Sequence, residues 1–318
     1  MKVSIVIRSY NEEKHIGRLL SGISKQTVRD PEIIVVDSGS TDATLAAVSR
    51  YPVRILTIDK EEFSFGRSLN VGCRAAGGQF IVLASAHVYP VYNDWLENLL
   101  KPFTDPAVAL VYGKQRGGQT AKYSEEQIFR KWFPESSDTS QKHPFCNNAN
   151  CAVRRGLWMQ MPYDETLTGL EDLDWAKRVV QKGHRIVYSS DAEIVHIHNE
   201  TLPSIYNRYR REAIALKTIY PQERFNFWTF MRLLAGNCVS DYYHSLLERV
   251  LRRNFASIFL FRLAQFWGTY CGYLQTGQIS GQLRDKFYYP NGFRCSQPTV
   301  VPSRSARRIE YSAVGEEV

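Results

Sequence analysis

The chain has 318 residues, of which 44% are hydrophobic and 23% are charged, and its formal net charge at pH 7 is +8. This composition is typical of a globular protein with a stable core and excludes an intrinsically disordered one. A basic balance would suit nucleic acid, anionic lipid or phosphorylated small molecules, but the sequence has no long Lys/Arg run, zinc-finger or RNA-binding motif, which argues against nucleic acid.

The opening of the chain predicts a strand, a helix and a second strand. Residues 3–7 are apolar and lead into the polar turn 8–13, a helical pattern occupies 16–23, and the buried run 33–36 ends on Asp37. This order predicts two parallel strands joined by a right-handed crossover. Ligands of open α/β sheets bind at the carboxyl ends of such strands, where both polar turns fall. We therefore expect a nucleotide-type pocket there.

Two further strands are predicted at 53–58 and 80–84, separated by a helix that begins at 65–72. Near its start, Arg67 and Asn70 either face a phosphate or ribose or act only as capping residues. A helix and a strand are then expected at 94–100 and 108–113.

Residues 116–145 are polar and irregular, and 136–142 within them are typical of a mobile surface loop. Such a loop is either an active-site lid or a plain solvated insertion. Compact sequence returns at 146–200, and the chain is helical, basic and aromatic from about 203 to 285. The tail from Pro298 is rich in Ser, Arg and Glu, so we expect it to be disordered.

Glu171 and Asp172 stand at the predicted start of a helix that continues with Trp175 and Arg178. Such a carboxylate pair suits two tasks, because one group can act as general base while the other holds an acceptor by hydrogen bonds. The positive end of the helix would keep both groups ionised. Acidic residues are also common at helix starts without any catalytic role.

Histidines occur in two places that suit a metal site. One is the Ser-Ala-His sequence at 85–87, after the fourth predicted strand. The other is the run 194–199, whose alternation points His196 and His198 to the same side of a strand. Imidazole suits Mn²⁺ or a softer ion better than Mg²⁺. The alternative is structural, with His87 capping the strand turn or contacting a sugar.

The six cysteines are scattered and form no Cys-x-x-Cys pair, which argues against a metal cluster or a disulfide framework. The first residues lack the features of a secretion signal, and no apolar stretch reaches the roughly 18 residues that a membrane span needs. We therefore expect a cytoplasmic protein, either soluble or peripheral on the inner face of the cell membrane.

Three segments together resemble the family 2 glycosyltransferases, which use nucleotide sugars and have the GT-A fold. They are Ser-Tyr-Asn-Glu at 9–12, Val-Asp-Ser-Gly-Ser-Thr-Asp at 36–42, and the Glu-Asp pair at 171–172 followed by Trp and Arg. The resemblance covers most of residues 1–290, and its C-terminal part is similar to bacterial transferases that build surface polysaccharides. It implies an α/β fold with a mixed, Rossmann-like sheet flanked by helices and a C-terminal helical extension.

The resemblance also implies how the chain is organised. A GT-A catalytic domain would occupy 1–202, with a nucleotide-binding half at about 1–115 and an acceptor half at about 116–202. A C-terminal helical region would follow at 203–290, and a tail at 291–318.

Roles of the family's residues carry over onto matching positions of this chain. In the family, the Asp that closes the second strand accepts from a uracil or thymine ring, and the Asp of the Glu-Asp pair is the catalytic base. The resemblance therefore implies Asp37 for the nucleotide base and Asp172 for catalysis, with Glu171 as acceptor holder or support. The residues expected to line the nucleotide and donor sugar are Arg8, Ser9, Tyr10, Glu12, Asp37, Ser38, Arg67, Asn70, Ser85, Asn148 and Asn150.

The segment 145–155 matches the part of the family that lines the sugar pocket. Amide side chains read sugar hydroxyls as donors and as acceptors, which favours Asn148 and Asn150 for this task. Arg154 or Arg155 would hold the diphosphate. The alternative is a turn into a strand, where Asn is simply favoured.

The expected metal site departs from the family pattern. The family usually has Asp-x-Asp after the fourth strand, where this chain has Ser-Ala-His at 85–87. The family frequently has a His near position 198 that contacts the metal or the diphosphate. We therefore expect His87 and His198 to hold a divalent metal, Mn²⁺ in preference to Mg²⁺, with His196 a less favoured ligand. Otherwise the diphosphate is neutralised in another way.

The resemblance thus implies an inverting hexosyl- or deoxyhexosyltransferase. It would move a sugar from a nucleoside-diphosphate donor, UDP- or dTDP-sugar favoured, to a glycan or lipid-linked acceptor in bacterial polysaccharide synthesis. Apolar faces flanked by Arg in the C-terminal third suit either an anionic membrane interface or packing on the catalytic core.

A rival interpretation is a catalytically silent sugar-nucleotide-binding or scaffold protein of a polysaccharide assembly complex, suggested by the missing Asp-x-Asp. The presence of Glu171 and Asp172 argues against it. A nucleotidyltransferase would need a glycine-rich, basic phosphate loop after the first strand, and the sequence at 9–12 is not one.

Overall fold

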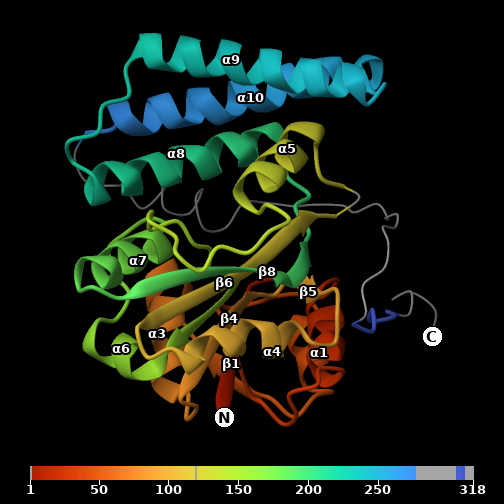
Figure 1. The fold of residues 1–318 in the computed structure, drawn as a ribbon, viewed down its shortest axis with the longest axis vertical. Helices are drawn as coiled ribbons and strands as arrows, with labels where there is room; N and C mark the ends of the chain where they lie inside the picture. Colours follow the sequence, from red (N-terminus) through yellow and green to blue (C-terminus); the bar gives the residue numbers. More distant parts are fainter. Residues whose placement is uncertain (1, 119, 277–305, 312–318) are drawn as a thin grey trace.

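One eight-stranded sheet carries the fold, with the strand order β3-β2-β1-β4-β7-β6-β8-β5 (Figure 1). The computed structural model describes residues 2–118, 120–276 and 306–311. The strands are β1 Val3–Ser9, β2 Glu32–Asp37, β3 Arg54–Thr57, β4 Phe80–Ser85, β5 Val88–Pro90, β6 Val108–Gly117, β7 Asn150–Arg154 and β8 Arg185–His196.

Helices surround the sheet and extend beyond it. Those of the first two thirds are α1 Ile16–Ser24, α2 Thr44–Val48, α3 Phe65–Ala75, α4 Trp95–Leu100, α5 Tyr123–Trp132, α6 Arg155–Gln160 and α7 Glu171–Gln181. Those of the last third are α8 Leu202–Ile219, α9 Phe227–Leu247 and α10 Leu251–Leu274. Short 3₁₀ turns occur at Lys60–Glu62 and Lys101–Thr104.

The first four strands are parallel, as the opening of the sequence predicts. Most Val, Ile and Leu side chains of β1, β2 and β4 are buried, on both faces of the sheet, which is why these strands form nearly continuous apolar runs, whereas β3 is largely exposed. The register places Ser9 of β1 beside Asp37 of β2, and Arg8 beside Ser85 of β4. The polar ends of three strands therefore meet at one edge of the sheet.

β7 runs antiparallel to β4, and this direction corrects one prediction. Asn150 pairs with Ala84 near the carboxyl end of β4, whereas Arg154 pairs with Phe80 at its other end. The Arg154 guanidinium donates to the carbonyls of Phe103, Asp105 and Val108, and Arg155 follows it into α6. The prediction that Arg154 or Arg155 holds a diphosphate is therefore wrong, because both lie at the opposite end of the sheet.

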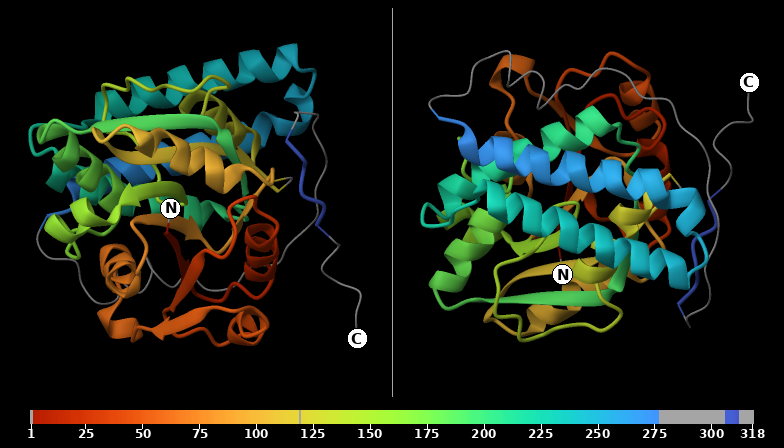
Figure 2. Two further views of the ribbon diagram at one scale, coloured as in Figure 1. Left: turned by 60° about the horizontal axis from the view of Figure 1, so that its bottom comes forward. Right: turned by 90° about the horizontal axis from the view of Figure 1, so that it is seen from above.

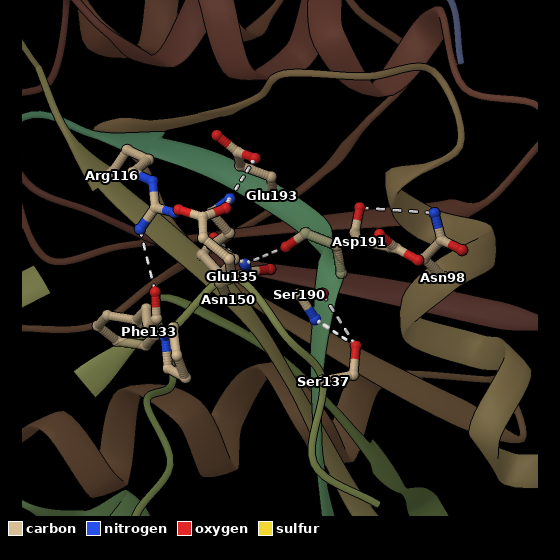
Figure 3. Close-up of polar contacts among 12 residues, drawn as sticks. Asn98, Arg116, Phe133, Glu135, Ser137, Asn150, Ser190, Asp191 and Glu193 are labelled. Atoms are coloured by element: carbon tan, nitrogen blue, oxygen red, sulfur yellow. Dashed lines mark hydrogen bonds and ion pairs between the residues drawn. The ribbon is translucent and has the colours of Figure 1, made fainter. Parts of the chain in front are cut away.

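Residues 116–145 are more ordered than their polar sequence indicates, because α5 forms within them. The exposed segment after α5 is also attached to the sheet at several points (Figure 3). Glu135 forms ion pairs with Lys114 and Arg116 of β6, and Ser137 is hydrogen-bonded to Ser190 of β8.

The last three helices form a layer on one side of the sheet (Figure 1). α10 packs between α8 and α9, and α8 is the nearest of the three to the sheet. Within the described residues, none of the helices combines the length and the apolar character needed to cross a bilayer.

Part of the tail packs beside β5 and α1, so the expectation of disorder is wrong for residues 306–311. Ile309 donates its backbone N–H to Val91, and the Tyr311 hydroxyl donates to the carbonyl of Pro90 beside α1. The other tail residues, and the predicted helical positions 277–285, lie outside the described residues.

A buried ion pair joins the two outer helices. Arg262 of α10 donates from Nε and Nη2 to both oxygens of Asp241 of α9, at 2.8 and 2.9 Å, and both side chains are buried. Because removal of one partner leaves the other charge unpaired in a low-dielectric interior, such a pair is costly to break singly.

We predict that Arg262→Met lowers the free energy of unfolding by about 3–5 kcal/mol, because Asp241 then stays buried without its partner. The double variant Asp241→Leu/Arg262→Met should recover most of this loss. Urea unfolding followed by circular dichroism measures both. A double variant as unstable as Arg262→Met alone would contradict the account.

Candidate active site

Polar residues gather where β1, β2 and β4 end. Those predicted for the nucleotide and found at this edge are Arg8, Ser9, Tyr10, Asp37, Ser38 and Ser85. Asp37 is buried and accepts from the backbone N–H groups of Gly39 and Ser40 at 3.0 and 2.9 Å. Gly39 has a φ of +85°, which glycine adopts without strain, so the loop after β2 turns back over the Asp37 carboxylate.

Asn70 and Arg67 are occupied by protein partners. The Asn70 amide donates to the Tyr163 carbonyl and to Glu165, and its oxygen accepts from the Trp158 indole N–H. Arg67 forms ion pairs with Glu62 and Glu165. These contacts fix α3 to the segment before α7, and we leave both residues out of the proposed site.

Asn150 is also a structural residue. Its amide nitrogen donates to the carbonyls of Lys114 and Ala192 at 3.1 and 2.8 Å, and its oxygen accepts from the Trp95 indole N–H at 2.8 Å. Figure 3 shows it among the polar contacts that join β6, β7 and β8. Asn150 therefore supports the sheet beneath the site and is left out of the sugar contacts.

The carboxylates of Glu171 and Asp172 lie at the start of α7, close to this edge. Glu171 Oε1 accepts from Arg8 Nη1 at 3.3 Å and from the Asn148 amide at 3.4 Å, while Asp172 Oδ2 accepts from the Asn148 backbone N–H at 3.2 Å. Leu170, just before them, has a left-handed φ of +56°. This conformation costs a non-glycine residue roughly 1–2 kcal/mol, and such strain concentrates at functional sites.

The Asp172 carboxyl is the most perturbed acid of this cluster. Burial is the main cause, the negative charge of Glu171 adds to it, and together they raise the pKa of Asp172 to about 7. Hydrogen bonds from the backbone N–H groups of Leu173 and Asn148 act in the opposite direction. Asp172 is therefore suited to take up and release a proton near neutral pH.

Two residues that lie near Arg8, Phe65 of α3 and Arg211 of α8, were not predicted. The guanidinium carbons of Arg8 and Arg211 lie 4.8 and 4.5 Å from the centre of the Phe65 ring. Arg211 belongs to α8, so the C-terminal helices contribute a second cation to the Phe65 ring that Arg8, the partner of Glu171, also contacts. No local sequence pattern reveals this contact, because Phe65 and Arg211 are far apart along the chain.

His87, His196 and His198 come together at the ends of β4 and β8. One ring nitrogen from each lies within 4.8 Å of the others, and the Nε2 atoms of His196 and His198 are 3.0 Å apart. Pairing of Val88 with His196 brings His87 beside β8. The structure therefore includes His196, which we predicted to be the less favoured ligand, in the cluster together with His87 and His198.

Each of these imidazoles has an oxygen partner at Nδ1. The partners are Glu12 for His87 at 2.6 Å, Gln115 for His196 at 2.8 Å and Glu125 for His198 at 2.7 Å. Glu12, which we predicted for the nucleotide, thus contacts the histidine cluster through His87.

This donor set fits a divalent cation. A neutral imidazole that donates from Nδ1 keeps a lone pair on Nε2, and metal-bound histidines usually have such an outer partner. Two lone pairs 3.0 Å apart, on His196 and His198, repel unless a proton or a metal ion lies between them. Burial and the neighbouring histidines hold the pKa of His196 below its usual value, which keeps it neutral, as a ligand must be.

Comparison with known proteins agrees with this architecture. Residues 4–161 match the family model for glycosyl transferase family 2. The resemblance of the chain to family 2 glycosyltransferases is therefore confirmed over these residues. The family 2 region thus contains the ends of β1, β2 and β4 together with Asn148, whereas Glu171, Asp172 and two of the histidines follow it.

Two curated relatives cover a larger part of the chain. It is 27% identical over 222 residues to the O-antigen chain rhamnosyltransferase RfbN of Salmonella typhimurium, which is 66% of this chain and 70% of that protein. It is 28% identical over 219 residues to the O-antigen chain rhamnosyltransferase WbaN of Salmonella anatum, covering 65% of this chain and 69% of the relative.

Solved structures show the same fold. A mannosyltransferase from Pyrobaculum calidifontis, in complex with GDP-Man and Mn²⁺, is 20% identical with a TM-score of 0.58 and covers 92% of this chain and 88% of its own. Residues 1–349 of S. aureus TarS in complex with UDP are 17% identical with a TM-score of 0.51, covering 97% and 98%. The predicted GT-A fold with a C-terminal helical extension is confirmed.

We predict that Asp172→Asn stabilises the protein more at pH 8 than at pH 5. Because the folded-state pKa of Asp172 lies above its unfolded value, the wild type loses stability as the pH rises through about 7, and the uncharged variant does not. The difference should grow by roughly 1–4 kcal/mol over this interval. Urea unfolding at both pH values measures it. Asp174→Asn, in the same turn but paired with Arg178, is the control; equal pH dependence in both variants would contradict the assignment.

Proposed function

We propose that this protein is an inverting glycosyltransferase that uses a nucleoside-diphosphate sugar. The observation that carries the proposal is the position of Asp172: a partly buried carboxylate with a raised pKa, connected through Glu171 and Arg8 to the strand ends where a nucleotide would bind. Sugar transfer requires a general base close to the nucleotide pocket, whereas a scaffold protein would need only the pocket.

The donor is the first part of the proposal. Asp37 and its loop would hold the base of a UDP- or dTDP-sugar, and Ser9, Tyr10 and Ser38 would line the nucleoside. The two rhamnosyltransferase relatives support a hexosyl or deoxyhexosyl donor, and the GDP-Man and UDP complexes of the structural neighbours support a nucleotide sugar of some kind.

The chemical step follows from the carboxylate pair. Asp172 takes the proton of the acceptor hydroxyl as the oxygen attacks the anomeric carbon on the face opposite the diphosphate. The C–O bond to the diphosphate breaks, and the sugar changes its anomeric configuration. Glu171, held by Arg8 and Asn148, orients the acceptor, and the guanidinium groups of Arg8 and Arg211 favour the negative charge that grows on the leaving group.

A divalent metal is the third part. His87, His196 and His198 would hold it, and their imidazole donors favour Mn²⁺ over Mg²⁺. When bound, the metal supplies positive charge for the leaving diphosphate. The mannosyltransferase structure and that of GalNAc-T7 both contain Mn²⁺, which supports a metal of this kind.

The acceptor that we propose is a glycan or lipid-linked saccharide of bacterial polysaccharide synthesis, as the O-antigen relatives support. A lipid-linked acceptor would bring a cytoplasmic enzyme to the inner face of the anionic cell membrane. In this proposal residues 1–202 form the catalytic domain, with halves at about 1–115 and 116–202. The helical region is 203–290, and the tail is 291–318.

We expect a nucleoside diphosphate to raise the melting temperature in the presence of Mn²⁺, only weakly with Mg²⁺, and not in EDTA. A thermal-shift panel of UDP, dTDP, GDP and CMP measures this. His198→Ala should remove the Mn²⁺ effect, and His184→Ala, outside the cluster, should keep it. Equal shifts in EDTA would remove the metal from the proposal, and no shift with any nucleotide would contradict the proposed function itself.

We further expect Asp172→Asn to lower donor turnover by roughly 10²- to 10⁴-fold, the usual contribution of a general base, without weakening nucleotide binding. The control variant Asp174→Asn should turn over the donor at the wild-type rate.

In the wild type, turnover should rise with pH through about 7, and Glu171→Gln should move that rise to lower pH because a like charge is lost. A wild type that binds nucleotide but releases no sugar from any donor would favour the scaffold alternative.

A further inference from the structure

The outer surfaces of α9 and α10 carry large apolar side chains that no other described residue covers. Trp228 is 78% exposed, Val239 67% and Leu247 62%. Others in the same stripe of α9 are Met231, Tyr243 and Leu246, and α10 adds Phe255, Phe259, Leu260 and Trp267. The two helices lie side by side over the rest of the molecule (Figure 2), so their stripes belong to one layer, which we call the α9–α10 face.

Internal packing does not explain this face. The opposite sides of both helices are already buried, with Phe230 of α9 and Ile258, Phe261 and Phe266 of α10 in the interior. The Asp241–Arg262 pair fixes the two helices to each other. The exposed apolar side chains are therefore additional to what the helices need for folding, and patches of this kind usually mark an interaction surface.

The charges around the face are almost all positive. Exposed arginines occur at 224, 232, 249, 252 and 253, and residues 221–276 contain no lysine. The carboxylates of the same stretch are Glu223, the buried Asp241, and Glu248, which is paired with Arg130 of α5. An anionic surface would complement this pattern.

A second copy of the chain would not complement it. Two such faces packed together would bring arginines against arginines with few carboxylates to pair them, and like charges across an interface are costly. A bilayer meets both requirements, because its anionic head groups attract the arginines while Trp, Phe and Leu enter the boundary between head groups and acyl chains.

We propose that the α9–α10 face docks on an anionic membrane surface, with both helices lying in the plane of the interface. α8 lies between this face and the sheet, and its Arg211 contacts the Phe65 ring, which Arg8, the ion-pair partner of Glu171, also contacts. Docking would therefore hold the active site at a fixed height above the lipid. That a lipid-linked acceptor is presented there rests on the proposed function, whereas the docking itself does not.

The test is co-sedimentation of the full chain with vesicles of phosphatidylcholine, alone or mixed with phosphatidylglycerol. We expect binding to the mixed vesicles that weakens as salt is added. Trp228→Ser/Leu247→Ser and Arg252→Glu/Arg253→Glu should each lower the partition coefficient at least roughly tenfold, since each arginine near an anionic surface contributes about fivefold. The matched controls Met159→Ser and Arg50→Glu, at exposed positions on the catalytic core, should bind like the wild type.

Nucleotide thermal shifts on the same variants show whether they are folded and separate this proposal from the proposed function. Vesicle binding without a nucleotide shift would support docking and contradict the transferase. Absence of vesicle binding by the wild type, or equal losses in the controls, would overturn docking. So would a lipid-free dimer that Trp228→Ser/Leu247→Ser converts to a monomer, because the face would then be covered by a second copy.

Discussion

The site depends on two adjacent carboxylates at one helix start, of which Glu171 is buried and Asp172 is partly buried. Glu171 and Asp172 repel each other, and each is tolerated only because donors reach it: Arg8 and the Asn148 side chain for Glu171, backbone N–H groups for Asp172. Arg8 is the penultimate residue of β1 and Asn148 precedes β7, and both strands neighbour β4. The strand order of the sheet is thus what makes the pair possible, and the raised pKa of Asp172 follows from it.

Local patterns in the sequence predicted the parallel half of the fold well. Apolar runs at β1, β2 and β4 with polar ends are visible in a short window, and parallel strands bring those ends to one edge. The direction of β7 is not visible in this way. It places Arg154 at the wrong end of the sheet for a diphosphate and makes Asn150 a support of three strands. α5 was missed because its surroundings are polar, and it is held partly by Arg130–Glu248 and by contact with α9 and α10.

In the candidate site, too, some features were predictable from local sequence patterns and others arise only from the fold. Alternation along one strand predicted that His196 and His198 lie on the same side of it, and the position of His87 after β4 predicted that His87 lies near the same site. Their oxygen partners Glu12, Gln115 and Glu125 come from three separate elements, so only the fold brings them together. Asn70 fits the pattern of a ligand-binding helix start, yet its amide is fully engaged in joining α3 to the segment before α7.

The most direct test of the account is proton NMR of the first sugar released from a nucleotide-sugar donor by the purified protein. Without an acceptor, water takes the place of the hydroxyl that Asp172 deprotonates. The account predicts release of one sugar with the anomeric configuration opposite to that in the donor. A sugar released with the donor's configuration would contradict the inverting mechanism, and release that persists in Asp172→Asn would contradict the role of its carboxylate.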